Sequence, residues 1–157
     1  MRLTCLFCFF LLAAISPLWA GHTPKTLIFL RVHVQTAGEG LSAQQATTLA
    51  LPPDNENIQV RALPEATESD LIDVKVDAAS QVRLFFNRRG TVNLSASTAQ
   101  NQGRILVVLI NGQVVYAPTI DEQITNGELD IPHPLNPDVI KLLQQTAAAN
   151  AKEASRD

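Results

Sequence analysis

The sequence has little charge, few aromatic side chains and no excess of basic residues. Charged residues make up 17% of the 157 positions and aromatic residues 5%, while 46% are apolar. The formal net charge is −3, so the chain lacks the basic face with which nucleic-acid-binding proteins contact phosphates, and we expect no nucleic-acid partner. An apolar fraction this high also excludes a wholly disordered chain. We therefore expect one folded domain with a hydrophobic core of its own.

Cysteine is nearly absent, and both cysteines lie within the first 20 residues. These residues have the pattern of an export signal: Arg2 precedes an apolar stretch that Pro17 ends, and Ala20 suits a signal peptidase. We predict a signal peptide at 1–20 and a periplasmic or secreted chain without disulfides. The alternative is an uncleaved N-terminal segment that anchors the chain in a membrane, because this uncharged stretch is long enough to span one.

The sequence also lacks the residue patterns of common catalytic and metal sites. The three histidines, His22, His33 and His133, have no metal-ligand spacing. No serine lies in a nucleophile elbow, and the neighbouring acids Asp121 and Glu122 would point apart on an extended chain. We therefore predict no catalytic residue, no metal and no cofactor, and a protein that is not an enzyme.

Strand patterns occur along most of the chain. The run at 105–110 has six apolar residues without alternation, which is typical of a central strand covered on both faces. Asn111 and Gly112 follow, and both tolerate the positive φ of a tight turn, so 113–116 should return as an antiparallel partner. The other predicted strands are 27–34, 58–62, 72–76, 81–86 and 128–131.

Helix signals are clear in one segment and ambiguous in another. Asn136 can cap a helix and Pro137 fits its first position, which predicts a helix over 137–145. The segment 87–102 has helical spacing but is rich in poor helix formers, so propensity alone leaves it open. Thr67 can cap a short turn that leads into the next strand.

The predicted domain spans 21–146, and its longest part without strong helix or strand patterns is 37–57. The glycines and prolines of that segment predict an irregular insertion, with at most a brief strand at 49–51. Long loops are often functional, so the alternative function is a small periplasmic enzyme or inhibitor with its site there. Residues 147–157 are predicted to form a flexible C-terminal tail.

A series of short motifs between Thr67 and Gln145 resembles a known family. The motifs are Thr67-Glu68-Ser69-Asp70-Leu71, Phe85-Phe86-Asn87-Arg88-Arg89-Gly90, Thr98-Ala99-Gln100-Asn101-Gln102-Gly103, Val107-Val108-Leu109-Ile110-Asn111-Gly112-Gln113-Val114, Ala117-Pro118-Thr119-Ile120 and Ile124-Thr125-Asn126-Gly127. In this order and spacing they resemble the head subdomain of the first periplasmic region of SecD, the export-motor subunit of bacteria. The resemblance implies a helix at 89–101 and a stand-alone, exported copy of the module.

These observations predict an α+β fold with a mainly antiparallel sheet of about five strands and two helices packed on one face. The expected function is that of a non-enzymatic periplasmic binding or accessory module, which contacts exported polypeptides or envelope machinery. Its partner would be a protein or an unfolded polypeptide laid along an exposed strand edge, and no membrane span would remain after signal removal. The residues predicted to bind it are Val114, Tyr116 and Ile120, with Tyr116 as the aromatic anchor.

Overall fold

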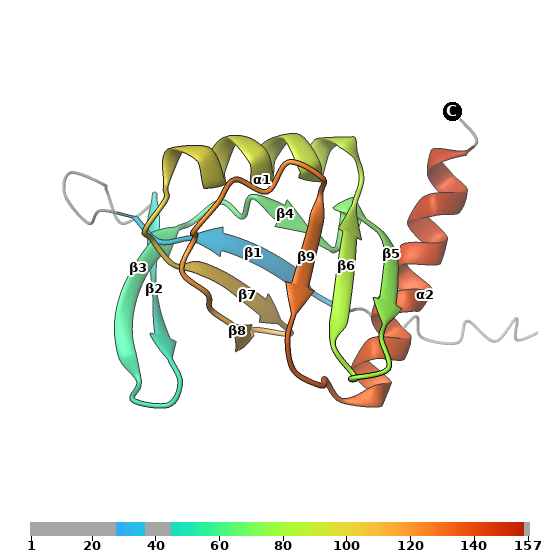
Figure 1. Cartoon of the computed structure of the whole chain (residues 1–157), viewed down its shortest axis with the longest axis horizontal. Coiled ribbons are helices and arrows are strands. Elements are labelled where there is room, and N and C mark those ends of the chain that lie inside the picture. The colour runs from blue at the N-terminus through green and yellow to red at the C-terminus, as the bar shows by residue number, and fades with distance from the viewer. Residues whose placement is uncertain (1–27, 37–44, 156–157) are drawn as a thin grey trace, which may run out of the picture.

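The structure is a computed structural model that describes residues 28–36 and 45–155 (Figure 1). Its elements are β1 (Leu30–Val34), β2 (Ala46–Leu51), β3 (Glu56–Arg61), β4 (Ala66–Thr67), the 3-10 helix η1 (Glu68–Asp70), β5 (Leu71–Val76), β6 (Val82–Phe86), α1 (Arg88–Gln100), β7 (Leu106–Ile110), β8 (Gln113–Tyr116), β9 (Glu128–Ile131) and α2 (Pro137–Ala154). The signal peptide predicted at 1–20 lies outside these residues. Within the described part of the chain, no helix is long and apolar enough to cross a membrane.

The strands form three antiparallel sheets, ordered β4-β1-β7-β8, β2-β3 and β5-β6-β9. The predicted α+β class is confirmed, but the strands do not form the single sheet of about five that we expected. Both faces of β7 are apolar, so burying them requires a layer on each side. Dividing the strands among separate sheets supplies those two layers.

Strand β7 is the centre of the fold, and all five of its residues are buried. Leu106, Val108 and Ile110 belong to the main core, which includes residues from both helices and from the β5-β6-β9 sheet. Val107 and Leu109 belong to a second core beneath the β2–β3 hairpin. The prediction of a central strand covered on both faces is therefore confirmed.

The described part of the predicted insertion is a β-hairpin rather than an irregular loop. Strand β2 pairs with β3 from Ala46 opposite Arg61 to Leu51 opposite Glu56, and the proline-rich residues 52–55 form its turn. The strand pattern of β2 is weak in the sequence because Leu51 is the one residue of this strand that is buried. Residues 37–44, the first part of the insertion, lie outside the described residues.

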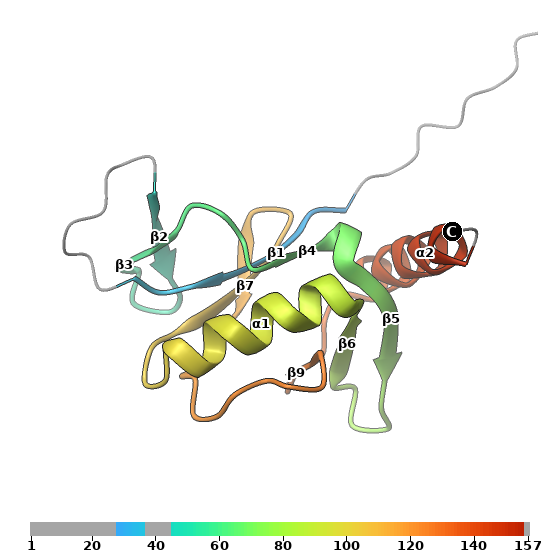
Figure 2. The same ribbon diagram turned by 90° about the horizontal axis from the view of Figure 1, so that it is seen from above.

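Helix α1 matches the helix implied by the resemblance to within one residue at each end. The Asn87 side-chain oxygen accepts from the Gly90 N–H at 3.0 Å, and this N-cap starts the helix. The two helices do not lie together on one face as predicted. Figures 1 and 2 show α1 running lengthwise beside β1 and β4, while α2 packs against β5 at the other end of the molecule.

Helix α2 begins at Pro137 as predicted but continues to Ala154, so most of the predicted flexible tail is helical. Alanine has the highest helix propensity, and Ala147 is buried in the main core. The Asn150 side-chain amide also donates to the carbonyl oxygens of Glu68 and Leu71, at 2.7 and 2.8 Å. These contacts with a distant segment extend the helix beyond the point where its apolar pattern fades.

The turn at η1 connects β4, β5 and α1 through one buried carboxylate. Thr67 is the N-cap, as predicted, and forms a reciprocal capping box with Asp70. The Asp70 side chain accepts from the Thr67 N–H at 2.9 Å and from the Arg89 Nε of α1 at 2.7 Å. Asp70 therefore ties the start of α1 to the turn that precedes β5.

His33 links β1 to the β2–β3 hairpin, because its Nδ1 lies 2.7 Å from the Arg61 carbonyl oxygen. Burial lowers the pKa of His33 below its usual 6.5; the bond to Arg61 opposes this, Arg31 lowers the pKa further and Glu65 raises it. The unfolded chain thus binds a proton more readily than the folded one. The stability that His33 contributes is complete above pH 6.5 and is lost as the pH falls through 6.5 towards the folded-state pKa.

We predict that the free energy of unfolding in urea falls when the pH drops from about one unit above 6.5 to about one unit below it. His33→Gln should remove most of this dependence, because glutamine does not titrate. His133→Gln is the matched control and should keep the dependence, because this variant retains His33 and its contact with the Arg61 carbonyl oxygen. An identical pH profile in wild type and His33→Gln would contradict the assignment.

Candidate functional site

A groove of about 370 Å³ lies beside strand β8 and strand β9. Its apolar lining consists of Leu106, Tyr116, Pro118, Ile120, Ile124 and Leu129, and its polar lining of Thr119, Asp121, Glu122 and Asp130. Two of the three residues predicted to bind a partner, Tyr116 and Ile120, therefore lie in one groove. Side chains from β7, from β9 and from the connection between β8 and β9 meet there.

The connection at 117–124 is fixed by backbone hydrogen bonds to the start of β7 and the residues before it. The Leu106 N–H donates to the Pro118 carbonyl at 2.9 Å, and the Ile120 N–H donates to the Arg104 carbonyl at 2.8 Å. These bonds hold the segment in an extended form along one side of the groove. The groove is therefore built on a fixed framework rather than on a loose loop.

Val114, the third predicted residue, does not line this groove. In β8, Val114 pairs with Leu109 and Tyr116 pairs with Val108, so Val115 is an extra residue between the two pairs. This β-bulge places Val114 against the core beneath the hairpin and Tyr116 against the main core. Val114 and Tyr116 therefore face different cores, and of these two only Tyr116 lines the groove.

Tyr116 lies at the end of an edge strand. Strand β8 ends the order β4-β1-β7-β8 and pairs with β7 alone among the described strands. The Tyr116 ring is half-buried and stands 6.1 Å from the His133 ring, tilted at 57°. His133 follows β9, so this ring contact connects the edge of the β4-β1-β7-β8 sheet with the segment after β9 of the β5-β6-β9 sheet.

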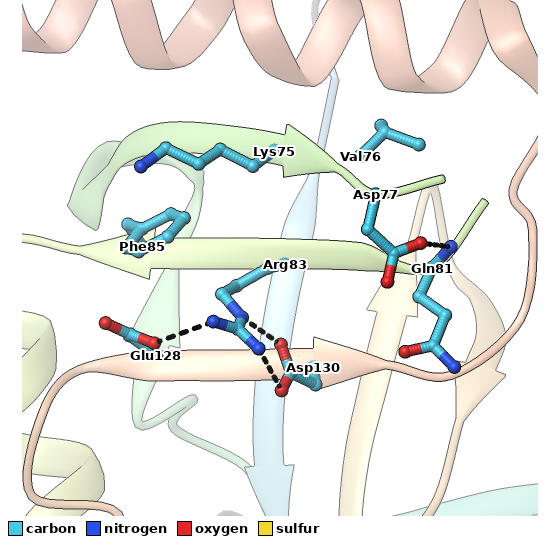
Figure 3. A pocket seen from close by; sticks show the side chains of 8 residues that line it. All are labelled: Lys75, Val76, Asp77, Gln81, Arg83, Phe85, Glu128 and Asp130. Atoms are coloured by element: carbon cyan, nitrogen blue, oxygen red, sulfur yellow. Dashed lines mark hydrogen bonds and ion pairs between the residues drawn. The ribbon is translucent and has the colours of Figure 1, made fainter. Parts of the chain in front are cut away.

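A second hollow, of about 440 Å³, lies over the exposed face of the β5-β6-β9 sheet (Figure 3). Arg83 forms a bidentate pair with Asp130, at 2.5 and 3.0 Å, and its guanidinium lies 3.4 Å from Glu128. The hydrogen bonds that Arg83 donates to Asp130, together with the negative charge of Asp130, raise the pKa of Arg83 above its usual value. Lys75 lies over the Phe85 ring, with Nζ 4.6 Å from the ring centroid.

This charged face was not predicted from the sequence. The alternation of β6, together with the pairing of Arg83 with Lys75 and Asp130 across the strands, could have predicted it. Because its charged groups already neutralise one another, this face has the character of a solvated sheet surface. The groove at Tyr116 is therefore the stronger candidate for a binding site.

No arrangement suited to metal binding occurs in the described residues. Within 28–36 and 45–155, no group of three or more histidine, cysteine or acidic side chains could hold a metal ion. His33 bonds to the hairpin strand β3, whereas His133 contacts Tyr116. These two histidines thus contact different parts of the fold and do not form a joint metal site.

Two solved structures of SecDF have a fold similar to that of this chain. A structure of SecDF, described as a membrane component that enhances protein export, matches with a TM-score of 0.53 and 22% identity, covering 75% of this chain and 62% of that one. SecDF in a super-membrane-facing form matches with a TM-score of 0.52 and 21% identity, over 78% of this chain and 18% of that one. The chain is thus an α+β domain with a fold found in SecDF.

The sequence comparison identifies the family. Residues 44–138 match the family described as SecDF, P1 head subdomain, and the chain belongs to this family. The protein translocase subunit SecD of Acidaminococcus fermentans is 38% identical over 69 residues, which cover 41% of this chain and 16% of that subunit. The resemblance to the SecD head drawn from the sequence motifs is therefore confirmed, and the whole groove lies within the matched residues.

Proposed function

We propose that this chain is a non-enzymatic accessory module of protein export that holds an extended polypeptide outside the cytoplasm. Two similarities support a role in export: a protein translocase subunit is similar in sequence, and SecDF, a component that enhances protein export, has a similar fold. The proposal includes removal of residues 1–20 as a signal peptide and a periplasmic location for the rest. The partner is an exported polypeptide or a protein of the envelope machinery.

The position of Tyr116 carries this proposal. A polypeptide can extend an antiparallel sheet by pairing with its edge strand, and β8 is an edge strand. An apolar side chain of that polypeptide would then pack into the groove beside the half-buried Tyr116 ring. Tyrosine offers a large contact area at a small loss of conformational entropy, which suits an anchor at such a site.

The alternative site at 37–57 has less support. Its described residues, 45–57, include β2, the hairpin turn and the start of β3. Leu49 and Leu51 pack on the second core, and no observation on the described residues favours an enzyme or an inhibitor.

The proposal predicts that Tyr116→Ala weakens binding of an extended apolar peptide of about ten residues by about tenfold, as loss of an interface anchor does. Phe85→Ala is the matched control, because Phe85 is also half-buried on a sheet but lies outside the groove. Fluorescence anisotropy of a labelled peptide measures the affinity, and circular dichroism checks the fold of each variant.

A second variant tests the strand edge itself. Val114→Pro removes one backbone N–H from β8 on the side away from β7 and should also weaken binding if the peptide pairs with this edge. If both Tyr116→Ala and Val114→Pro bind the peptide as the wild type does, neither the edge nor the groove is the site.

A further inference from the structure

The polar side of the groove is acidic. Asp121, Glu122 and Asp130 line it, and its lining includes no lysine or arginine. Asp130 is paired with Arg83, whereas Asp121 and Glu122 are exposed and form no ion pair among the described residues. An adjoining hollow of about 330 Å³ shares Glu122 and Asp130 and adds Glu128, which like Asp130 is paired with Arg83. Uncompensated negative charge therefore borders the apolar lining.

We propose that the groove selects extended polypeptide segments in which a lysine or arginine adjoins apolar residues. This inference rests on the proposed function and specifies which polypeptides the site prefers. Apolar side chains of the segment would pack on Tyr116 and Ile120, and the basic side chain would lie near Asp121 and Glu122. An acidic side chain at the same place would be repelled.

The order of residues along the chain supports a site that binds a basic side chain next to apolar ones. Asp121 and Glu122 directly follow Ile120, so the two carboxylates lie within one or two residue lengths of the apolar lining. A partner segment must therefore carry its positive charge within one or two residues of its apolar side chains to contact both parts of the groove. The same carboxylates would repel the phosphates of an anionic membrane surface, which favours a polypeptide as the occupant.

Three peptides of about ten residues test the inference, with identical apolar residues and either lysine, glutamine or glutamate at the polar positions. The full chain is expressed and assayed in the form in which it is purified. We expect the lysine peptide to bind about fivefold more tightly than the glutamine peptide, and the glutamate peptide to bind most weakly. The advantage of the lysine peptide should shrink as salt is added.

The decisive variant is Asp121→Asn/Glu122→Gln, which removes both charges while keeping the size of the side chains. It should bind the lysine and glutamine peptides equally. Asp54→Asn/Glu56→Gln is the matched control, because both residues are exposed at the β2–β3 turn and the net charge changes equally. The control should keep the fivefold preference.

The outcomes separate the two proposals. Equal binding of the lysine and glutamine peptides by the wild type would overturn the selectivity and leave the proposed function standing. A preference that survives in Asp121→Asn/Glu122→Gln would mean that Asp121 and Glu122 do not supply the selecting charge, and it would also overturn the inference. If no peptide binds, or if only vesicles of anionic lipid are bound, both proposals fail.

Discussion

Gly127→Ala should destabilise the protein by about 3 kcal/mol, since it combines backbone strain with a steric overlap. Gly127 has a φ of +71°, and a Cβ at this position would overlap the Thr91 hydroxyl and lie 3.0 Å from the Thr91 Cβ. The Thr91 side chain cannot turn away without loss, because its hydroxyl donates to the Asn87 carbonyl at 2.9 Å. Urea denaturation measures the change in the free energy of unfolding.

Gly112→Ala is the control that isolates the overlap. Gly112 has a similar φ of +80°, but a Cβ there would meet nothing within 4 Å. This substitution should therefore cost only the strain of the left-handed conformation, about 1–2 kcal/mol. Equal losses in the two variants would mean that the contact between Gly127 and Thr91 is unimportant.

The second large effect is expected for Asp70→Ala, which should cost about 2–3 kcal/mol. The substitution leaves the Thr67 N–H without its acceptor at the capped turn and breaks the contact of that turn with Arg89 of α1. The buried Asp70 oxygens thus stabilise a connection among three elements. Thermal and urea unfolding monitored by circular dichroism provide the measurement.

Arg89→Ala separates the ion pair from the cap. The Arg89 side chain is 65% exposed, so its loss should account for only a small part of the effect of Asp70→Ala. If Arg89→Ala destabilises the protein as much as Asp70→Ala does, the ion pair rather than the cap holds the turn.

The central hairpin was predictable because its signals are local. Asn111 and Gly112 have φ values of 51° and 80°, as a tight turn requires, and the apolar run before them is buried on both faces. The capping residues Thr67 and Asn136 were found for the same reason, since a cap depends on its immediate neighbours.

Features that depend on distant contacts were less predictable. Helix α1 contains poor helix formers, yet Leu94 is fully buried and the Thr98 hydroxyl bonds to the Leu94 carbonyl at 2.7 Å. Tertiary packing decides such a segment, and only the family resemblance indicated it. The extension of α2 through Asn150 likewise depends on the carbonyls of a segment far away in the sequence.

The candidate site was predictable in composition but not in geometry. The sequence indicated Tyr116 and Ile120 as neighbours of an edge strand, and both line the groove. It gave no indication of the bulge at Val115, which turns Val114 towards the other core. The sequence predicted no binding role for Asp121 and Glu122, because the groove that they line forms only when β9 packs next to the connection.

The hydrogen bonds that fix the connection at 117–124 affect the entropic cost of binding a partner. Since Leu106 and Arg104 already hold this segment extended, docking would require no loop to become ordered first. The groove is preorganised for binding, so the loss of conformational entropy on binding would come mainly from the polypeptide that binds. A preorganised groove can bind different polypeptide segments one after another without a change in its own conformation.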